Sequence, residues 1–281
     1  MTATVPTEPG TREPSATEPA QRWDGSSVVT QIAVLTARSL RAFAGDPGLV
    51  LIGLIQPVMT LFVFTQIFTN FALAANLPAG TEYLDFLMPA VLVNHVVQTS
   101  SQTGIGLVED LRNGIVARLR SMPIMPSSLL LARSTSDLIR SAIQVVLILV
   151  MAWGVLGYSP AGGFAGTVLS ALLTLGVGSA LSWAFLAMGA TMRRTEPMQN
   201  ISVLVMVPLM FISSAFVPIE ELPDWLEFVA RINPLTYAVD ASRAVALGLD
   251  GTYLVAPSLF ISLAVAVVSA FIAIRGFRKP L

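Results

Sequence analysis

Residues 164–191 read FAGTVLSALLTLGVGSALSWAFLAMGAT, a stretch without a single charged side chain. About 20 consecutive apolar residues are enough for a helix to cross the hydrocarbon core of a membrane. Five further stretches meet this requirement, at roughly 48–69, 84–106, 138–157, 198–217 and 254–274. The sequence therefore predicts an all-α integral membrane protein with six transmembrane helices.

The composition of the chain is that of a membrane protein. Of its 281 residues, 54% are hydrophobic and 12% are charged, whereas a soluble domain usually carries about 25% charged residues. The chain contains no cysteine, which excludes disulfides, thiolate metal sites and a cysteine nucleophile. Its net charge of −1 provides no basic field for a nucleic acid. We therefore expect membrane lipid as its surroundings, no bound nucleic acid and no metal site.

The basic residues are distributed unevenly over the segments that connect the predicted spans. Short cytoplasmic loops of membrane proteins collect Arg and Lys. All basic residues except Arg231 and Arg243 lie before the first span, between the second and third, between the fourth and fifth, or after the sixth, with Arg140 at the edge of the third. The sequence therefore predicts a multi-pass protein of a bacterial plasma membrane with both termini in the cytoplasm.

The two segments that precede the first span differ in character. Residues 1–27 are rich in Pro, Thr, Glu and Ser, so that a disordered cytoplasmic segment is expected. The transmembrane domain is expected to comprise residues 28–281. Its first part, residues 28–43, places apolar side chains on one helical arc with Arg38 and Arg41 opposite. This pattern predicts an interfacial helix on the cytoplasmic leaflet.

Residues 218–248 are too interrupted by prolines to cross the membrane. Pro223 is placed to start a short helix, Asn233 to end it, and Pro234 to open a second helix that closes near Gly248. At about 1.5 Å per residue, each piece is shorter than a bilayer is thick. We expect a re-entrant hairpin that dips into the outer leaflet. The alternative is that the second piece prolongs the sixth span.

The second helix of this hairpin carries a charged pair. Asp240 and Arg243 are three residues apart and can pair on one helical face, with Tyr237 one turn before them. Two interpretations are open: the hairpin closes the exit of a pathway, or the pair only stabilises a short helix.

A charged stretch, EDLRNGIVARLRSMPIMP at 109–126, separates the second and third predicted spans. Helical spacing aligns four apolar side chains of residues 109–122 into a narrow stripe, namely Leu111, Ile115, Leu119 and Met122. Charged side chains surround the stripe, namely Glu109, Arg112, Arg118 and Arg120, and Asp110 joins Glu109 near the expected helix N-terminus. A helix of this kind suits a groove on a partner protein. The pattern is also compatible with a solvated helix resting on lipid headgroups.

The order of these parts resembles the permease subunit of an ATP-binding cassette exporter of the type-2 class, in its daunorubicin-resistance-like branch. The resemblance rests on the interfacial helix, on LRNGIVARLRSMPI at 111–124 and on INPLTYAVDASRAVALG at 232–248, and it covers about residues 28–280. It implies that the helix at 109–122 is a coupling helix docked on a separate cytoplasmic ATPase, present in two copies that bind ATP and Mg. It also implies a second permease chain, identical or different, and export of amphipathic drugs, lipids or glycoconjugates.

The residues themselves indicate that the energy comes from another subunit. A nucleotide-binding P-loop needs a lysine after a glycine-rich turn, but the one lysine, Lys279, precedes Pro280 and follows no such turn. We therefore expect no ATP hydrolysis and no bound cofactor in this chain. A gradient-driven secondary transporter of hydrophobic compounds, the alternative function, needs ionisable residues within its spans. The central parts of the predicted spans contain no acidic residue and one histidine, His95.

Polar side chains within the predicted spans are candidates for a substrate pathway. In the second span, one helical face carries Asn94, Gln98, Ser101 and Gln102, with His95 beside it; the first span carries Gln56 and Thr60, and the fifth carries Ser213 and Ser214. The resemblance implies that these three spans border the pathway at the centre of a permease dimer. Hydrogen bonding between helices is the alternative role for the amides. For His95, helix packing is favoured over a proton relay.

Overall fold

The computed structural model describes residues 26–74, 81–115, 125–192, 194–215, 219, 222–249 and 252–278. Nearly all of the segment predicted to be disordered, 1–27, lies outside these residues. The described part folds into helices without any strand, which confirms the all-α class. The main elements are α1 (Val28–Ala44), α2 (Pro47–Ala74), α3 (Tyr83–Arg112), α5 (Pro126–Met151) with the π-helical turn η1 (Ala152–Leu156), α6 (Gly163–Met192), α7 (Thr195–Phe211), α8 (Asp224–Ile232), α9 (Pro234–Ala246) and α10 (Val255–Arg278).

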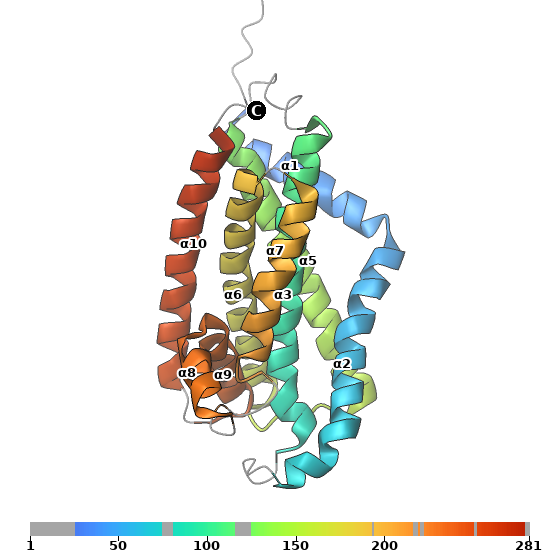
Figure 1. Ribbon diagram of the computed structural model, residues 1–281. Helices are drawn as coiled ribbons and strands as arrows, with labels where there is room; N and C mark the ends of the chain where they lie inside the picture. The colour runs from blue at the N-terminus through green and yellow to red at the C-terminus, as the bar shows by residue number, and fades with distance from the viewer. Residues whose placement is uncertain are drawn as a thin grey trace, which may run out of the picture.

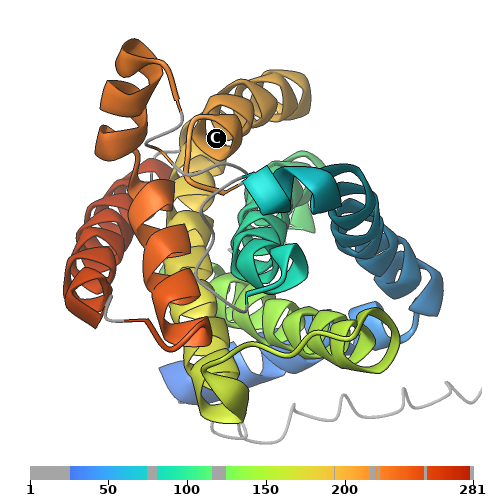
Figure 2. The same ribbon diagram turned by 90° about the horizontal axis from the view of Figure 1, so that it is seen from below.

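The helices form one elongated bundle. Helices α2, α3, α5, α6, α7 and α10 run along its long axis, each in the opposite direction to the one before it (Figure 1). Helix α1 lies across one end of the bundle, whereas α8 and α9 pack at the opposite end. Seen along the axis, α3 stands between α2, α5 and α6 (Figure 2), and it also contacts α7 and α9.

Four described helices are long and apolar enough to cross a membrane, at Val50–Ile67, Ser127–Leu156, Gly163–Met192 and Val255–Phe277. Helix α3 has 30 residues but a lower mean hydropathy, and α7 has only 17 residues. The prediction of six spans therefore stays a prediction for these two helices.

Two helices have bounds that differ from those of the predicted spans. The sequence predicts the third span from residue 138, but α5 begins at Pro126, which stands at the first helical position where proline is well tolerated. This earlier start includes Asp137 in the candidate span Ser127–Leu156, in the half of the helix that precedes its apolar run. The sequence predicts a fifth span that reaches 217, but α7 ends at Phe211, one turn after Pro208.

The contact between α3 and α6 is made by small residues. The Ser100 hydroxyl of α3 donates to the Gly178 carbonyl of α6 at 2.9 Å, and an added Cβ at Gly189 would lie 2.7 Å from the Gly104 carbonyl oxygen. Within a membrane, small residues let helix backbones approach closely and gain dispersion contacts. The Ser182 hydroxyl of α6 also donates to the Ser100 hydroxyl at 3.2 Å, on the same face as Gly178.

Helix α1 buries two polar side chains and exposes two valines. Gln31 and Thr36 are buried, and the Thr36 hydroxyl donates to the Ala132 carbonyl of α5 at 3.3 Å. Val29 and Val34 are 75% and 62% exposed. The predicted helix at 28–43 is confirmed, and its outward apolar surface suits a lipid interface.

The helices of the hairpin begin and end at the predicted residues. Helix α8 follows Pro223, Asn233 caps α9 with Pro234 at its first position, and Gly248 adopts φ +64° just after the end of α9. A turn thus separates α9 from α10, so the alternative that α9 prolongs the sixth span is wrong.

A glycine pair on α6 tests the role of close packing. Gly189→Ala places its Cβ against the α3 backbone, which cannot move aside as a side chain could, so the free energy of unfolding should fall by about 1–3 kcal/mol. In contrast, Gly176 has no neighbouring atom within 4 Å of an added Cβ. Gly176→Ala should therefore retain the wild-type unfolding free energy or increase it, measured by denaturant unfolding in detergent. Equal effects of the two substitutions would contradict the packing argument.

Candidate functional site

A small cavity lies where α2, α3 and α7 meet, and it gathers most of the predicted pathway residues. Its volume is about 30 Å³, and it is lined by Gln56, Pro57, Thr60, Val91, Asn94, His95, Gln98 and Met210. We call this set the polar pocket. The predicted faces of the first and second spans thus converge on one point. The cavity is large enough for water but not for a drug-sized molecule.

The remaining predicted pathway residues lie elsewhere. Ser101 is buried, and its hydroxyl donates to the Gln98 carbonyl at 2.8 Å. Gln102 lines a different cavity. Ser213 and Ser214 follow the end of α7, where the Ser213 hydroxyl donates to the Met210 carbonyl at 2.7 Å. These four residues therefore do not line the polar pocket.

His95 has a partner that sequence reasoning missed. Gln144 of α5 lies beside the imidazole, and its amide nitrogen would be 2.9 Å from a Cβ added at Gly53 of α2. His95 and Gln144 are both buried, and helices α2, α3 and α5 meet at this contact. The sequence signal that could have revealed this contact was Gln144 itself, an amide within the apolar stretch of α5. This contact agrees with the interpretation of His95 as a packing residue.

The segment predicted as one helix at 109–122 is divided in the structure. Glu109, Asp110, Leu111 and Arg112 form the last turn of α3, so the two acids lie at a helix C-terminus rather than at an N-terminus. The helix stops because Asn113 and Gly114 form its C-cap, with Gly114 at φ +70°. Helical backbone resumes at Ile115. Arg118, Leu119, Arg120 and Met122 lie outside the described residues.

Two contacts of charged side chains connect the end of α3 to neighbouring helices. Asp110 pairs with Arg133 of α5, and Arg112 donates to the Thr195 hydroxyl at the start of α7. Asp110 and Arg112 thus connect helices within the bundle, while Glu109 is exposed.

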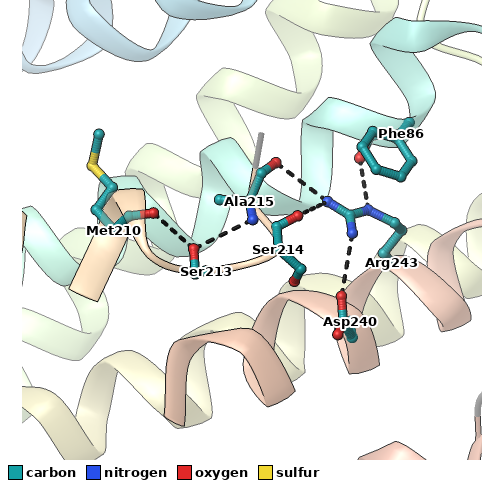
Figure 3. A network of polar contacts seen from close by, with 7 residues as sticks. All are labelled: Phe86, Met210, Ser213, Ser214, Ala215, Asp240 and Arg243. Atoms are coloured by element: carbon teal, nitrogen blue, oxygen red, sulfur yellow. Dashed lines mark hydrogen bonds and ion pairs between the residues drawn. The ribbon is translucent and has the colours of Figure 1, made fainter. Parts of the chain in front are cut away.

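At the opposite end of the bundle, Arg243 holds three elements together (Figure 3). Its guanidinium donates to the Phe86 carbonyl of α3 at 3.1 Å and to the Ser214 and Ala215 carbonyls after α7 at 2.8 and 3.3 Å. It also forms the predicted ion pair with Asp240, at 3.2 Å. Burial lowers the pKa of Arg243 to about 10, and the Asp240 carboxylate partly offsets this effect. The guanidinium therefore stays charged at neutral pH.

Asn233 performs a related task for α7. Its amide nitrogen donates to the Leu209 and Ile212 carbonyls, at 2.7 and 2.5 Å, and its oxygen accepts from the Leu235 amide at 2.9 Å. Together, Asn233 and Arg243 satisfy carbonyls that the end of α7 leaves without a helical partner. We call these two side chains, with the backbone carbonyls that accept from them, the hairpin lock.

Tyr237 links the two helices of the hairpin. Its hydroxyl donates to the Arg231 carbonyl near the end of α8, at 2.9 Å. All five predicted hairpin residues, namely Asn233, Pro234, Tyr237, Asp240 and Arg243, thus have a structural task.

A comparison with known proteins identifies the family of this bundle. Residues 30–247 match the ABC-2 type transporter family. The chain belongs to this family. The resemblance found in the segments at 111–124 and 232–248 is thereby confirmed.

Three relatives illustrate the similarity. The daunorubicin resistance ABC transporter permease protein of Streptomyces coeruleorubidus is 29% identical over 242 residues, which cover 86% of this chain and 84% of that protein. A doxorubicin resistance ABC transporter permease of Mycobacterium tuberculosis is 25% identical over 224 residues, 78% of each chain. An inner membrane transport permease of Escherichia coli is 25% identical over 197 residues, which cover 68% of this chain and 51% of that protein. The ABC-2 protein described here is accordingly a multi-pass membrane permease.

The hairpin lock can be tested with Arg243→Met. Because the change leaves several buried carbonyls without a donor, the free energy of unfolding should fall by roughly 2–4 kcal/mol. The chain contains no native cysteine, so a single Ala238→Cys in buried α9 reports opening of the hairpin. Its maleimide labelling should accelerate when Arg243 is replaced.

The matched control is Arg231→Met on the same hairpin. Among the described residues the Arg231 side chain pairs with Glu227 alone, and it is largely exposed, so its loss should change the free energy of unfolding by less than about 1 kcal/mol. Unchanged labelling of the Arg243 variant would contradict the lock.

Proposed function

We propose that this ABC-2 permease exports amphipathic compounds, drugs foremost, with lipids and glycoconjugates as the other classes. The observation that carries the proposal is the polar pocket, where three amides, one hydroxyl and one imidazole converge beside apolar side chains. Such a lining suits cargo with both polar and apolar parts. In the closed arrangement the pocket has room only for water, and separation of α2 from α3 would widen it. The names of two relatives, for daunorubicin and doxorubicin resistance, favour drugs as cargo.

The proposed arrangement in the membrane has six spans, formed by α2, α3, α5, α6, α7 and α10. Both termini and α1 then lie on the cytoplasmic side, because the basic residues concentrate there. The hairpin of α8 and α9 lies in the outer leaflet, where it covers the exit. The protein would reside in a bacterial plasma membrane.

A separate cytoplasmic ATPase is the proposed motor. Two copies would bind ATP and Mg and dock on the segment that follows Gly114, with two permease chains, identical or different, enclosing the pathway. Helix α3 supports this proposal because one rigid helix carries Asn94 and Gln98 in the polar pocket and ends at the docking segment. A tilt of the docked segment would therefore move the pocket.

Gradient-driven transport, the second candidate, is favoured by Asp137, an acid within a candidate span. However, Asp137 accepts a hydrogen bond from Ser182 and lies near Arg140 and Arg133. The contact with Ser182 joins α5 to α6, so helix packing accounts for this buried acid without a role in proton transport. The ATP-driven mechanism remains the proposed function.

Export can be measured as daunorubicin uptake into inside-out vesicles that contain the permease with its ATPase. We expect uptake that requires ATP. Gln98→Leu should reduce it several-fold, because the polar pocket loses an amide. Gln199→Leu, the same change at an exposed position of α7, should leave it unchanged. Uptake driven by a pH gradient without ATP would overturn the proposed mechanism.

The docking segment is tested by co-purification of the ATPase with the permease. Leu119→Asp should abolish retention of the ATPase, since a charge in the apolar stripe prevents burial in a groove. The same substitution at Leu249, beyond α9 at the opposite end of the bundle, should preserve retention. Normal recovery of the ATPase with Leu119→Asp would refute docking at this segment.

A further inference from the structure

A second cavity, of about 270 Å³, lies between α1, α3 and α5. Its charged and amide lining consists of Arg38, Gln102, Asp110, Arg133, Asp137 and Arg140. Basic residues from α1 and α5 thus face one cavity, which is partly open to the surface. We call it the arginine cavity. It is separate from the polar pocket, with which it shares no residue.

The charges in the arginine cavity do not balance. Arg133 pairs with Asp110, and the Asp137 carboxylate, three residues before Arg140 on α5, lies near enough to act on its charge. Arg38 takes part in no ion pair within the described part of the chain. Three guanidinium groups against two carboxylates leave one net positive charge, so the cavity would be completed by a ligand with a single negative charge.

Arg140 supplies a second, independent indication of a missing acceptor. Its guanidinium stacks on the Phe43 ring of α1, with 4.8 Å between the guanidinium carbon and the ring centroid. The Nε atom is buried and has no hydrogen-bond partner among the described residues. An unsatisfied buried donor is costly, and it is usually explained by a water or a ligand.

The surroundings of the cavity match the headgroup region of a membrane. Helix α1, which lies across this end of the bundle, contributes the apolar wall residues Leu35 and Ala42 (Figure 1). Outside the cavity, Val34 of α1 and Leu131 and Leu138 of α5 are exposed. Exposed aliphatic side chains on these helices would contact acyl chains, while the arginines line the cavity at the end of the bundle.

We propose that the arginine cavity binds the phosphodiester group of an anionic phospholipid from the leaflet in which α1 lies. A guanidinium matches the geometry of phosphate oxygens and can donate two parallel hydrogen bonds to them. Basic pockets between membrane helices bind anionic headgroups in this way. A phosphodiester carries the one negative charge that the cavity lacks, whereas a zwitterionic lipid brings its own ammonium and leaves the imbalance in place.

The bound lipid would connect α1 to the bundle. Arg38 belongs to α1 and Arg140 to α5, so a phosphate between them joins two helices that otherwise meet through hydrogen bonds such as that from Thr36. The permease should therefore be more stable with the lipid present. This inference is independent of the cargo proposal, because it concerns a cavity outside the pathway.

The test measures thermal unfolding of the delipidated full chain in detergent during titration with phosphatidylglycerol. Saturable stabilisation is expected, because a ligand that binds only the folded state raises its stability. Phosphatidylcholine with the same acyl chains should have no such effect, and neither should inorganic phosphate at equal concentration. Equal stabilisation by phosphatidylcholine would overturn the proposal, and stabilisation by inorganic phosphate alone would assign the cavity to a free anion instead of a lipid.

Variants locate the effect in the arginine cavity. Arg38→Gln and Arg140→Gln should each weaken the apparent affinity for phosphatidylglycerol about tenfold, the scale of one charged hydrogen bond. Arg41→Gln removes an exposed arginine of the same helix that does not line the cavity, and it should bind as the wild type does. Because Arg38 is itself exposed, its replacement should leave the fold intact even if Arg140→Gln impairs folding. An equal loss of affinity in the Arg41→Gln variant would show that lipid binding depends only on the overall charge of α1. That result would refute a specific site in the arginine cavity.

Discussion

The structure depends on one constraint, which is that a backbone carbonyl in an apolar environment needs a donor. Helix α7 ends at Phe211, and Ser213, Ser214 and Ala215, which follow it, are buried. Asn233 and Arg243 supply the missing donors from the hairpin. The position of α8 and α9 follows from this requirement, since the two side chains must reach the end of α7.

The same lock extends to α3 through the Phe86 carbonyl. Helix α3 then carries Asn94 and Gln98 to the polar pocket and Asp110 to its ion pair with Arg133 at the other end of the bundle. One helix therefore connects the hairpin, the pocket and the segment after Gly114. A displacement at either end acts on the pocket through a rigid element, which is the mechanical basis for coupling in the proposed function.

Local signals explain what the sequence could predict. Asn233 and Pro234 determine the boundary between α8 and α9 by backbone chemistry alone, and the spacing of Asp240 and Arg243 indicated their pairing. The carbonyl partners of Arg243 lie far away in the chain, so no local pattern could reveal them. The break at Asn113 and Gly114 was a readable C-cap signal, but the apolar stripe on either side favoured a single helix. Asp137 was placed outside the predicted third span, because its hydrogen-bond partner Ser182 belongs to α6 and the sequence of α5 alone could not reveal it.

The lower mean hydropathy of α3 has a physical reason. Helices attract each other weakly through apolar contact in lipid, because lipid tails are equally apolar, so polar contacts and close packing determine which helices associate. Helix α3 is buried along most of its length between α2, α5 and α6, and its side chains therefore meet protein rather than lipid. A central helix of this kind can carry Asn94, His95 and Gln98 without exposing them to hydrocarbon. Hydropathy thus identifies the helices that face lipid. It is a weaker indicator of a membrane span for a central helix such as α3, which carries the residues of the polar pocket.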